Sequence, residues 1–321
     1  MIQQYNSHGK FLLTGEYLVL KGALALALPL KFGQSLAVET LDSNEDRLFW
    51  IAYRPEGKWF SVTLNCDNLV NFSTNDPDKA LRLSEILQAV KQLNPKAFEG
   101  NDLRFTTRLD FDPNWGLGSS STLIASLARW ANVNPYELLK LTFGGSGYDI
   151  ACASAEGPIY YQLAGLDGFV LRNDAKQEPK LTPLVDPLVF NPPFADHLFF
   201  VYQGQKQSSS KEIKAFLAKV HPDDLQKDIE AVSEISRAVP KCQNIGEFSM
   251  LMQCHERIIA RCICQEPVQK RFPDFEGTLK SLGAWGGDFI LAATEWDESQ
   301  VNAYFKTKGL GVIFGYKDIV K

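Results

Sequence analysis

The sequence predicts an α+β fold divided between two domains. The chain has 321 residues, and at about 150 residues per domain this length suggests two domains. Short apolar runs separated by glycines, typical of buried strands, are mixed with amphipathic helical segments. Because strands and helices do not alternate regularly, the pattern favours α+β over a doubly wound parallel sheet. A polar, proline-containing stretch at 172–193 marks the joint, so we expect domains at 1–175 and 176–321.

The first half of the chain contains most of the expected strands. We expect strands at residues 10–14, 17–20, 23–28, 35–41, 47–53, 59–64 and 103–111. Helices are expected at 78–93, 119–132 and 135–143. The first helix is indicated by apolar residues at helical spacing, among them Leu81, Ile86, Leu87 and Val90.

The second half is richer in helices. A strand is expected at 197–203, followed by helices at 209–220, 223–239 and 245–264. A glycine-rich turn and strand at 283–294 come next, and a closing segment runs to residue 314.

Composition and charge narrow the class of protein. With 45% apolar and 22% charged residues, the chain is neither disordered nor fibrous, and it needs no disulfides to fold. A net charge of −5 lacks the basic surplus of a non-specific nucleic-acid binder. No signal-peptide core precedes residue 10, and the longest apolar run is too short to span a bilayer. We expect a cytoplasmic protein with no nucleic-acid or membrane partner and with reduced cysteines, since their spacing fits no zinc site.

The strongest local signal is a glycine- and serine-rich segment between a predicted strand and a predicted helix. It comprises Gly116, Leu117, Gly118, Ser119, Ser120 and Ser121. Glycines let a backbone approach a ligand closely, and a helix start offers N–H groups and a positive dipole end. The serine hydroxyls can donate to phosphate oxygens or bind Mg²⁺. The alternative is a turn that only caps the helix, because serine is a favoured N-cap residue.

Three further segments combine glycines with a charged residue. Asp149 follows a glycine pair and can accept a hydroxyl proton or organise a cation, or it can cap the next helix. Lys10 enters an apolar strand, where it can neutralise a phosphate or lower a partner's pKa, or extend its amine to solvent at a sheet edge. The stretch 283–288 (Gly-Ala-Trp-Gly-Gly-Asp) needs unusual backbone geometry, for a ligand or for a plain hairpin turn.

In this order and at these distances, the four segments resemble the motifs of the GHMP kinase superfamily, which includes galactokinases, homoserine kinases, mevalonate kinases and phosphomevalonate kinases. The first motif is similar to residues 9–17 (Gly-Lys-Phe-Leu-Leu-Thr-Gly-Glu-Tyr), and Pro-x-x-x-Gly-Leu-Gly-Ser-Ser is matched at 113–120. The third motif looks like residues 283–288. Tyrosine after Gly-Glu, the stretch 145–151 (Gly-Ser-Gly-Tyr-Asp-Ile-Ala) and Gly-Gly-Asp are most similar to phosphomevalonate kinases.

The resemblance implies a fold and an activity. The fold would pair an N-terminal ribosomal-S5-like α/β domain with a C-terminal ferredoxin-like domain. The activity would be ATP- and Mg²⁺-dependent phosphoryl transfer to a small mevalonate-type acid, by a monomer or homodimer. Phosphomevalonate is the favoured acceptor, followed by mevalonate and then by a sugar or sugar phosphate. Two alternatives with the same fold are a diphosphomevalonate decarboxylase and a nucleotide-binding regulator without catalysis.

The resemblance also implies roles for individual residues. The backbone of 116–121 would hold the ATP phosphates, with Ser120 on Mg²⁺. Asp149 would accept the proton of the acceptor hydroxyl or orient that oxygen, and Lys10 would keep Asp149 ionised. The residues expected to contact the acceptor or close over the phosphates are Glu16, Tyr17, Ser146, Gly147, Gly286 and Gly287. Trp285 departs from the motif, where a glycine is usual, and is expected to narrow the acceptor pocket. Glu137 appears out of register for a second Mg²⁺ ligand.

Overall fold

The structure is a computed structural model that forms two compact units. It describes residues 2–43, 45–100, 102–163, 183–204, 213, 216–217, 225–283, 285 and 287–321. Unit 1 comprises Met1–Gly9, Phe32–Pro113 and Leu117–Ser154, and unit 2 comprises Lys10–Lys31, Asn114–Gly116 and Ala155–Lys321. The long strands β1 (Ile2–Thr14) and β2 (Ala25–Thr40) therefore contribute residues to both units. The expected boundary at residue 175 falls outside the described residues and stays a prediction.

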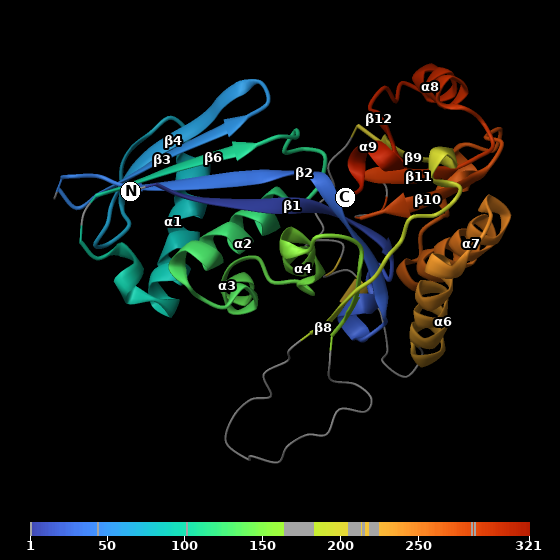
Figure 1. The fold of residues 1–321 in the computed structure, drawn as a ribbon, viewed down its shortest axis with the longest axis horizontal. Coiled ribbons are helices and arrows are strands. Elements are labelled where there is room, and N and C mark those ends of the chain that lie inside the picture. The colour runs from blue at the N-terminus through green and yellow to red at the C-terminus, as the bar shows by residue number, and fades with distance from the viewer. Residues whose placement is uncertain are drawn as a thin grey trace, which may run out of the picture. The chain divides into compact units, whose positions relative to one another are not determined.

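The sheet of unit 1 runs in the order β5-β4-β3-β6-β2, with β1 paired to β2 (Figure 1). Its further strands are β3 (Arg47–Arg54), β4 (Gly57–Asn65), β5 (Asn71–Thr74) and β6 (Leu103–Leu109). Strands β3 and β6 are parallel, while β4 pairs with β3 and β6 pairs with β2 in antiparallel fashion. Buried and more exposed residues alternate along β6, as expected for a sheet covered on one face.

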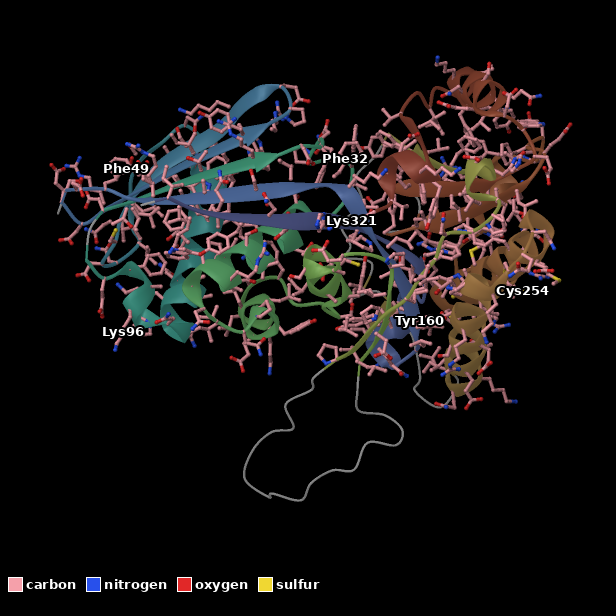
Figure 2. All side chains as sticks on the ribbon, viewed as in Figure 1. Phe32, Phe49, Lys96, Tyr160, Cys254 and Lys321 are labelled. Carbon is pink, nitrogen blue, oxygen red and sulfur yellow. The ribbon has the colours of Figure 1, made fainter. Side chains whose placement is uncertain are left out.

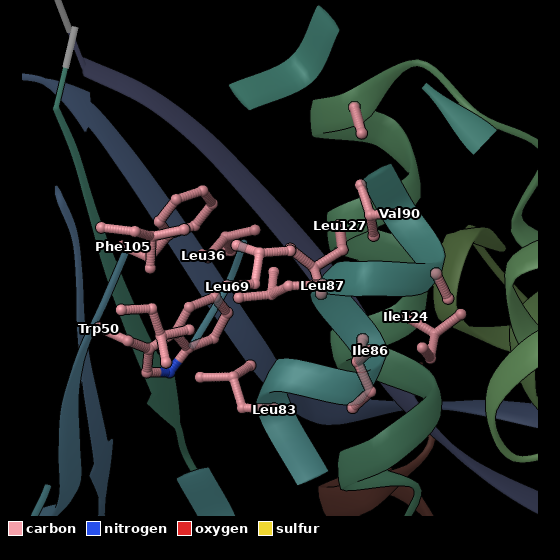
Figure 3. Close-up of a cluster of buried hydrophobic side chains, with 14 of the residues drawn as sticks. Leu36, Trp50, Leu69, Leu83, Ile86, Leu87, Val90, Phe105, Ile124 and Leu127 are labelled. Carbon is pink, nitrogen blue, oxygen red and sulfur yellow. The ribbon is translucent and has the colours of Figure 1, made fainter. Parts of the chain in front are cut away.

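Helices cover one face of this sheet (Figure 1). They are α1 (Pro77–Leu93), α2 (Ser119–Ala131), α3 (Pro135–Thr142), α4 (Tyr148–Ser154) and the 3₁₀ turn η2 (Pro95–Phe98). Helix α1 begins where the Asp76 carboxylate accepts the N–H of Lys79, with Pro77 as the first helical residue. Its apolar face contains Leu83, Ile86, Leu87 and Val90 (Figure 3). Leu81, expected on that face, is 64% exposed.

The core of unit 1 is built around aromatic side chains. Trp50 stacks on Phe105 with ring centroids 5.1 Å apart (Figure 3). Trp130 meets Phe105 edge-on, with ring centroids 4.7 Å apart. These rings lie between the sheet and the helices, and Trp50 and Phe105 are 1% and 0% exposed. Aromatic pairs of this geometry add stability beyond the area that they bury.

Unit 2 contains a four-stranded antiparallel sheet in the order β10-β11-β9-β12. Its strands are β9 (Leu198–Tyr202), β10 (Thr278–Leu282), β11 (Phe289–Ala293) and β12 (Ile313–Gly315). Helix α7 (Ile245–Ile263) connects the first two strands along the chain and α8 (Glu298–Thr307) connects the last two. This strand order and connectivity are ferredoxin-like, so the expectation for the C-terminal part is confirmed.

The rest of unit 2 is built on the parts of β1 and β2 that belong to it. Strand β2 pairs with β7 (Ile159–Gln162), and β7 pairs with β8 (Leu184–Pro187). Helix α6 (Gln226–Ala238) precedes α7, and the short elements are η1 (Leu18–Lys21), η3 (Ala195–His197), η5 (Val239–Lys241), η6 (Val268–Arg271) and α9 (Tyr316–Ile319). The helix expected at 209–220 falls largely outside the described residues.

The strand expected at 17–20 is wrong. Gly15 (φ +96°) and Tyr17 (φ +62°, ψ −49°) both have positive φ, and together they turn the chain sharply after β1. The N–H of Leu18 then donates to the carbonyl of Glu16 at 2.6 Å, and the chain continues as the 3₁₀ turn η1. An apolar run resembling a strand is therefore a compact turn, because local hydrogen bonds replace a sheet partner.

Several elements were not expected from the sequence, and β10 and α8 are the longest of those in unit 2 outside the glycine-rich segments. Strand β10 is fully buried although Lys280 lies at its centre, and this charge hides the apolar pattern of a core strand. Helix α8 has a capping box, in which Asp297 and Gln300 exchange hydrogen bonds, so a usable signal for its start is present in the sequence.

The six cysteines, all described, are free thiols, and Cys254 lies on α7 (Figure 2). Among the described residues, no group of three or more histidine, cysteine, aspartate or glutamate side chains could hold a metal ion. No helix in the described part of the chain is long and apolar enough to cross a membrane.

Candidate functional site

The glycine-rich turn before α2 has the backbone conformation that its glycines allow. Gly116 (φ +72°) and Gly118 (φ +99°) are left-handed, and Gly118 is the N-cap of α2. The Gly118 carbonyl accepts the N–H of Thr122 at 3.0 Å and the hydroxyl of Ser121 at 2.9 Å. The turn therefore leads directly into a 13-residue helix, whose first N–H groups have no carbonyl of the preceding turn to bind.

The side chains of this turn differ in what they can offer a ligand. Leu117 is 0% exposed, so its side chain belongs to the core and offers no surface to a ligand. The Ser121 hydroxyl is buried and bonded to Gly118, as a capping residue would be. Ser119 is half-buried and Ser120 is exposed. The positive end of α2 and these two hydroxyls together favour an anion.

A cavity of about 170 Å³ in unit 1 lies next to Ser119 and Ser120. Its other lining residues come from the sheet, α1 and the end of α3: Gln34, Trp50, Ala52, Trp59, Phe60, Lys79, Arg82, Leu83, Ile86, Thr107, Leu123 and Phe143. The Lys79 ammonium lies 5.6 Å from the centre of the Trp59 ring, and the Arg82 guanidinium lies 4.3 Å from that of Phe143. Flat aromatic walls with cations over them suit a planar, electron-rich ring.

Residues of this cavity could not be predicted from the sequence. Trp59, Arg82 and Phe143 belong to three segments separated by more than twenty residues each, and no spacing rule connects them. The one local signal is the helical spacing of α1, which places Lys79 and Arg82 on one side of that helix.

Asp149 occupies the first turn of α4 in unit 1. Gly147 (φ +85°) starts this turn, and its carbonyl accepts the N–H groups of Ile150 and Ala151 at 3.1 Å. The Asp149 carboxylate is half-buried and accepts the N–H of Ile150 at 3.0 Å. Burial, reinforced by the negative charge of Asp149, raises the pKa of Tyr136 to about 12. The aspartate thus lies at a helix start, where its negative charge is favoured, and Ser146 is half-buried beside it.

In unit 2, Lys10 contacts Gly116, the first glycine of the segment 116–121. Its ammonium donates to the carbonyl of Gly116 at 2.8 Å. The Asp288 carboxylate lies on the other side, with atoms 2.6 to 2.8 Å from where a Cβ on Gly116 would be. It also lies within 2.8 Å of a Cβ built on Gly283. Both glycines are needed because the buried carboxylate fills the space that any side chain would take.

Asp288 was part of the recognised motif but was not expected to be a site residue. Its side chain is 5% exposed, and its carbonyl accepts the N–H of Gln203 at 2.9 Å. Gly287 is buried beside it, while Gly286 lies outside the described residues. The signal that could have singled out Asp288 is an acidic residue directly before a fully apolar strand.

Glu16 and Tyr17 do not lie on an exposed surface. Glu16 is 2% exposed, and its carboxylate accepts a hydrogen bond from the ammonium of Lys280. Tyr17 is 7% exposed, and its hydroxyl accepts the N–H of Trp285 at 3.4 Å. Trp285 itself is 3% exposed and packs in the same apolar cluster as Tyr17.

Burial dominates the electrostatics around Glu16. It raises the pKa of Glu16 to about 7, and the Lys280 charge opposes this only in part. Burial, reinforced by Lys280, lowers the pKa of His255 well below its usual range. His255 Nε2 accepts the N–H of Gly15 at 2.8 Å, so this nitrogen carries no proton. The 3.4 Å approach of the same nitrogen to Glu16 is therefore not an ion pair.

Comparison with known proteins identifies the fold. No protein-family model and no curated protein sequence matches the chain. The Methanococcus jannaschii mevalonate kinase structure superposes with a TM-score of 0.67 at 15% identity, covering 98% of this chain and 97% of that one. The chain has the GHMP kinase fold.

Other solved structures of this fold are similar over equally long stretches. Streptococcus pneumoniae phosphomevalonate kinase in complex with phosphomevalonate and AMPPNP gives a TM-score of 0.65 at 16% identity, covering 98% of both chains. Lactococcus lactis galactokinase complexed with galactose gives 0.64 at 11% identity, covering 98% of this chain and 92% of that one. The expected architecture is confirmed, and the low identities leave the chemistry to be argued from the residues.

Proposed function

We propose that the chain is a cytoplasmic, ATP-dependent kinase of a small mevalonate-type acid, with phosphomevalonate favoured over mevalonate. The observation that carries the proposal is the position of Ser119 and Ser120. They begin α2, where phosphates are favoured, and they also line the cavity with aromatic walls. A nucleotide needs these two features side by side, one for its phosphates and one for its base.

The chain's own groups account for nucleotide binding. The N–H groups at the start of α2 would receive the phosphates, as at other helix N-termini. Trp59 and Phe143 would contact the base, with Lys79 and Arg82 above the rings. Mg²⁺ would neutralise phosphate charge, and the exposed Ser120 hydroxyl fits the role of a protein ligand to it. A single hydroxyl is adequate because Mg²⁺ usually takes its remaining ligands from phosphates and water.

Catalysis of phosphoryl transfer depends mainly on positioning of the reactants and on stabilisation of charge. In the proposal, Lys10 places positive charge at Gly116, where it is held by the 2.8 Å hydrogen bond. Asp149 orients the acceptor oxygen, and it accepts the proton when that oxygen belongs to a hydroxyl. With phosphomevalonate the acceptor is already a phosphate, so Asp149 positions it and removes no proton.

The choice of acceptor is supported by sequence likeness. The stretch around Asp149 and the tyrosine after Gly15-Glu16 are most similar to phosphomevalonate kinases. A phosphomevalonate kinase complex is among the structures of similar fold. We infer acceptor contacts from Ser146, Gly147 and the turn at Gly287.

The test is a coupled ADP-release assay with mevalonate, phosphomevalonate, galactose and sugar phosphates, in parallel with measured ATP binding. We expect the highest kcat/KM with phosphomevalonate. A higher kcat/KM with mevalonate or with a sugar would change the proposed acceptor but would still support kinase activity. Release of CO₂ with inorganic phosphate would indicate a decarboxylase, and ATP binding without transfer to any acceptor would indicate a regulator.

A further inference from the structure

Four polar side chains are buried together in unit 2, away from the residues to which the proposed function assigns chemistry. Glu16 follows β1, His255 and Glu256 lie on α7, and Lys280 is the central residue of β10. Each is 2% exposed or less. Removing a charge from water costs several kcal/mol of folding free energy unless the charge is well paired. A buried cluster of this kind is therefore poorly explained by stability alone.

Only one of the contacts to Glu16 in this cluster involves a charged donor. The Lys280 ammonium donates to Glu16 Oε1 and, at 2.9 Å, to the carbonyl of Ser281. His255 is neutral, because its Nε2 accepts the N–H of Gly15. Within the described residues, Glu16 Oε2 has no hydrogen-bond partner. The position of the Glu16 side chain therefore depends on Lys280.

Glu256, in the same cluster, accepts hydrogen bonds from other elements and not from Lys280. Its carboxylate accepts the N–H groups of Val268 and Ser281 and the Ser281 hydroxyl, each at 3.1 Å. These bonds attach α7 to β10 and to the start of η6. The strand that carries Lys280 is thus fixed independently of Glu16.

The Lys280–Glu16 contact holds a strained turn. Gly15 and Tyr17, on either side of Glu16, both have positive φ, and Tyr17 (ψ −49°) is the centre of a γ-turn, a strained conformation that costs about 1–3 kcal/mol. Such a turn persists only where surrounding contacts determine it. Here they are the Lys280–Glu16 hydrogen bond and the Gly15–His255 hydrogen bond.

The strained turn at residues 15–17 also contacts the glycine-rich segment after β10. The Tyr17 hydroxyl accepts the N–H of Trp285, and the Tyr17 ring packs against Phe216 with ring centroids 5.6 Å apart. Three residues later, Asp288 lies against Gly116, whose carbonyl holds Lys10. Contacts thus run from Lys280 through Glu16 and Tyr17 to Trp285, and Asp288, three residues along the same chain segment, contacts Gly116 at the start of the proposed phosphate-binding segment 116–121, all of them within unit 2.

We propose that Lys280 and Glu16 are positioning residues, whose contact fixes Tyr17 and, through Tyr17 and Trp285, holds the turn with Asp288 against Gly116. The inference rests on the proposed kinase function and assigns Glu16 to this network in place of the acceptor. A purely structural pair would stabilise the fold without setting the geometry of this turn.

The double variant Lys280→Met/Glu16→Gln carries neither buried charge, and it separates a purely structural role of the pair from a positioning role. Lys280→Met alone leaves a buried carboxylate without its donor, so both the melting temperature and kcat should fall. Adding Glu16→Gln removes the unpaired charge, and we expect the melting temperature to recover toward that of the parent. The double variant should keep its ATP Kd within about twofold, because the base cavity and α2 belong to unit 1. Its kcat should stay about 10–10²-fold low, the usual cost of misplaced groups.

A gentler variant tests the second contact if Lys280→Met does not fold. Tyr17→Phe keeps the ring and removes only the hydroxyl that accepts the Trp285 N–H, so kcat should fall several-fold with little change in melting temperature. Tyr316→Phe is the control, since it removes another buried hydroxyl of unit 2, one that donates to the Phe190 carbonyl at 2.8 Å. It should leave kcat unchanged.

Fluorescence gives a readout that does not depend on activity. Acrylamide quenching assigned to Trp285, from each protein minus its Trp285→Phe version, should increase in the double variant and in Tyr17→Phe. Recovery of kcat together with stability in the double variant, or unchanged Trp285 quenching, would overturn the proposal. Absence of phosphoryl transfer in the parent protein would instead overturn the proposed function, while the quenching comparison still reports whether Lys280 holds the turn.

Discussion

At the start of α2 in unit 1, the groups available to a ligand are backbone N–H groups and the hydroxyls of Ser119 and Ser120, beside a cavity with aromatic walls. Around Glu16 in unit 2, carboxylate and ammonium groups are almost fully buried and contact one another. The first region offers backbone N–H groups and hydroxyls, with Lys79 and Arg82 in the neighbouring cavity. The second region holds charges that solvent cannot reach. If the start of α2 receives phosphates as proposed, a chain with a net charge of −5 needs no basic surface to bind them, because the helix N–H groups supply the donors.

The largest effect should come from Asp149, the acidic group that the proposal places at the acceptor. Asp149→Asn keeps the shape and the hydrogen bond to Ile150, and removes the charge. We expect kcat to fall about 10²-fold with phosphomevalonate, which Asp149 only positions, and about 10²–10⁴-fold with an acceptor hydroxyl, whose proton Asp149 also accepts. Asp78→Asn is the control, since Asp78 is exposed in the first turn of α1. A parent-like kcat in Asp149→Asn would show that the carboxylate has no part in catalysis.

Gly116→Ala tests how far the phosphate-binding segment depends on the buried Asp288. The new Cβ would lie 2.6 to 2.8 Å from the Asp288 carboxylate, so either the carboxylate or the segment must move. We expect kcat to fall about 10²-fold, as for other misplaced catalytic groups. The free energy of unfolding should drop by about 1–2 kcal/mol for the left-handed backbone, and by about 1–3 kcal/mol more for the overpacking.

Gly309→Ala separates the cost of the left-handed backbone from the cost of overpacking against Asp288. Gly309 also lies in unit 2 and is left-handed (φ +79°), but nothing lies within 4 Å of an added Cβ. It should show only the backbone cost in urea unfolding and keep the parent kcat. Equal losses in the two variants would mean that contact with Asp288 does not matter.

The pH dependence of stability distinguishes the buried charges from the exposed ligand groups. Burial raises the pKa of Glu16 from 4.5 to about 7, so between these values the folded chain holds a proton that the unfolded chain releases. This contribution is complete below pH 4.5 and is lost as the pH rises through 7. Relative to Glu16→Gln, the parent should lose about 1–3 kcal/mol of unfolding free energy between pH 5 and 8.

His255, Glu256 and Lys280 face the same carboxylate, and all three remain in Glu16→Gln. The lowered pKa of His255 favours folding above pH 6.5 and acts in the opposite direction, but it affects both proteins alike. The difference between the two urea-unfolding curves therefore isolates Glu16. Parallel curves from pH 5 to 8 would contradict the raised pKa.

The two regions also differ in how much of them could be predicted from the sequence. The turn and helix start at 116–121 could be predicted because its glycines and serines act locally, through backbone conformation and helix capping, and their spacing is visible in one stretch. The position of Asp149 at a helix start could be predicted for the same reason, while the roles of both in phosphoryl transfer stay predictions. The helix and strand pattern likewise predicted the α+β class, because periodicity is local, whereas the ferredoxin-like part was expected only from the resemblance to the GHMP kinase superfamily.

Contacts between distant segments could not be predicted in this way. Glu16 was expected at the acceptor, but its partner Lys280 lies 264 positions later in the chain. Lys280 also concealed β10, because a charged residue in a core strand looks like surface until its partner is known. Trp59, Arg82 and Phe143 meet at one cavity only after the sheet and helices of unit 1 have packed. Burial and long-range pairing, rather than propensity, decide these positions.

The smallest effect is expected at the cavity beside Ser119 and Ser120, where the proposed binding of the ATP base depends on ring contacts and not on charge pairs. Trp59→Ala removes one aromatic wall and the ring that lies beneath Lys79. Stacking on an aromatic side chain contributes about 1–3 kcal/mol per base, so the ATP Kd should rise about tenfold while kcat at saturating ATP changes little. Trp296→Ala, which removes a ring packed edge-on against Phe275 in unit 2, is the matched control for losing a tryptophan. Isothermal titration with ATP and with inorganic triphosphate completes the test, because the triphosphate lacks a base and its affinity should not change. An unchanged ATP Kd in Trp59→Ala would place the base elsewhere and leave the start of α2 as a phosphate site without its neighbouring cavity.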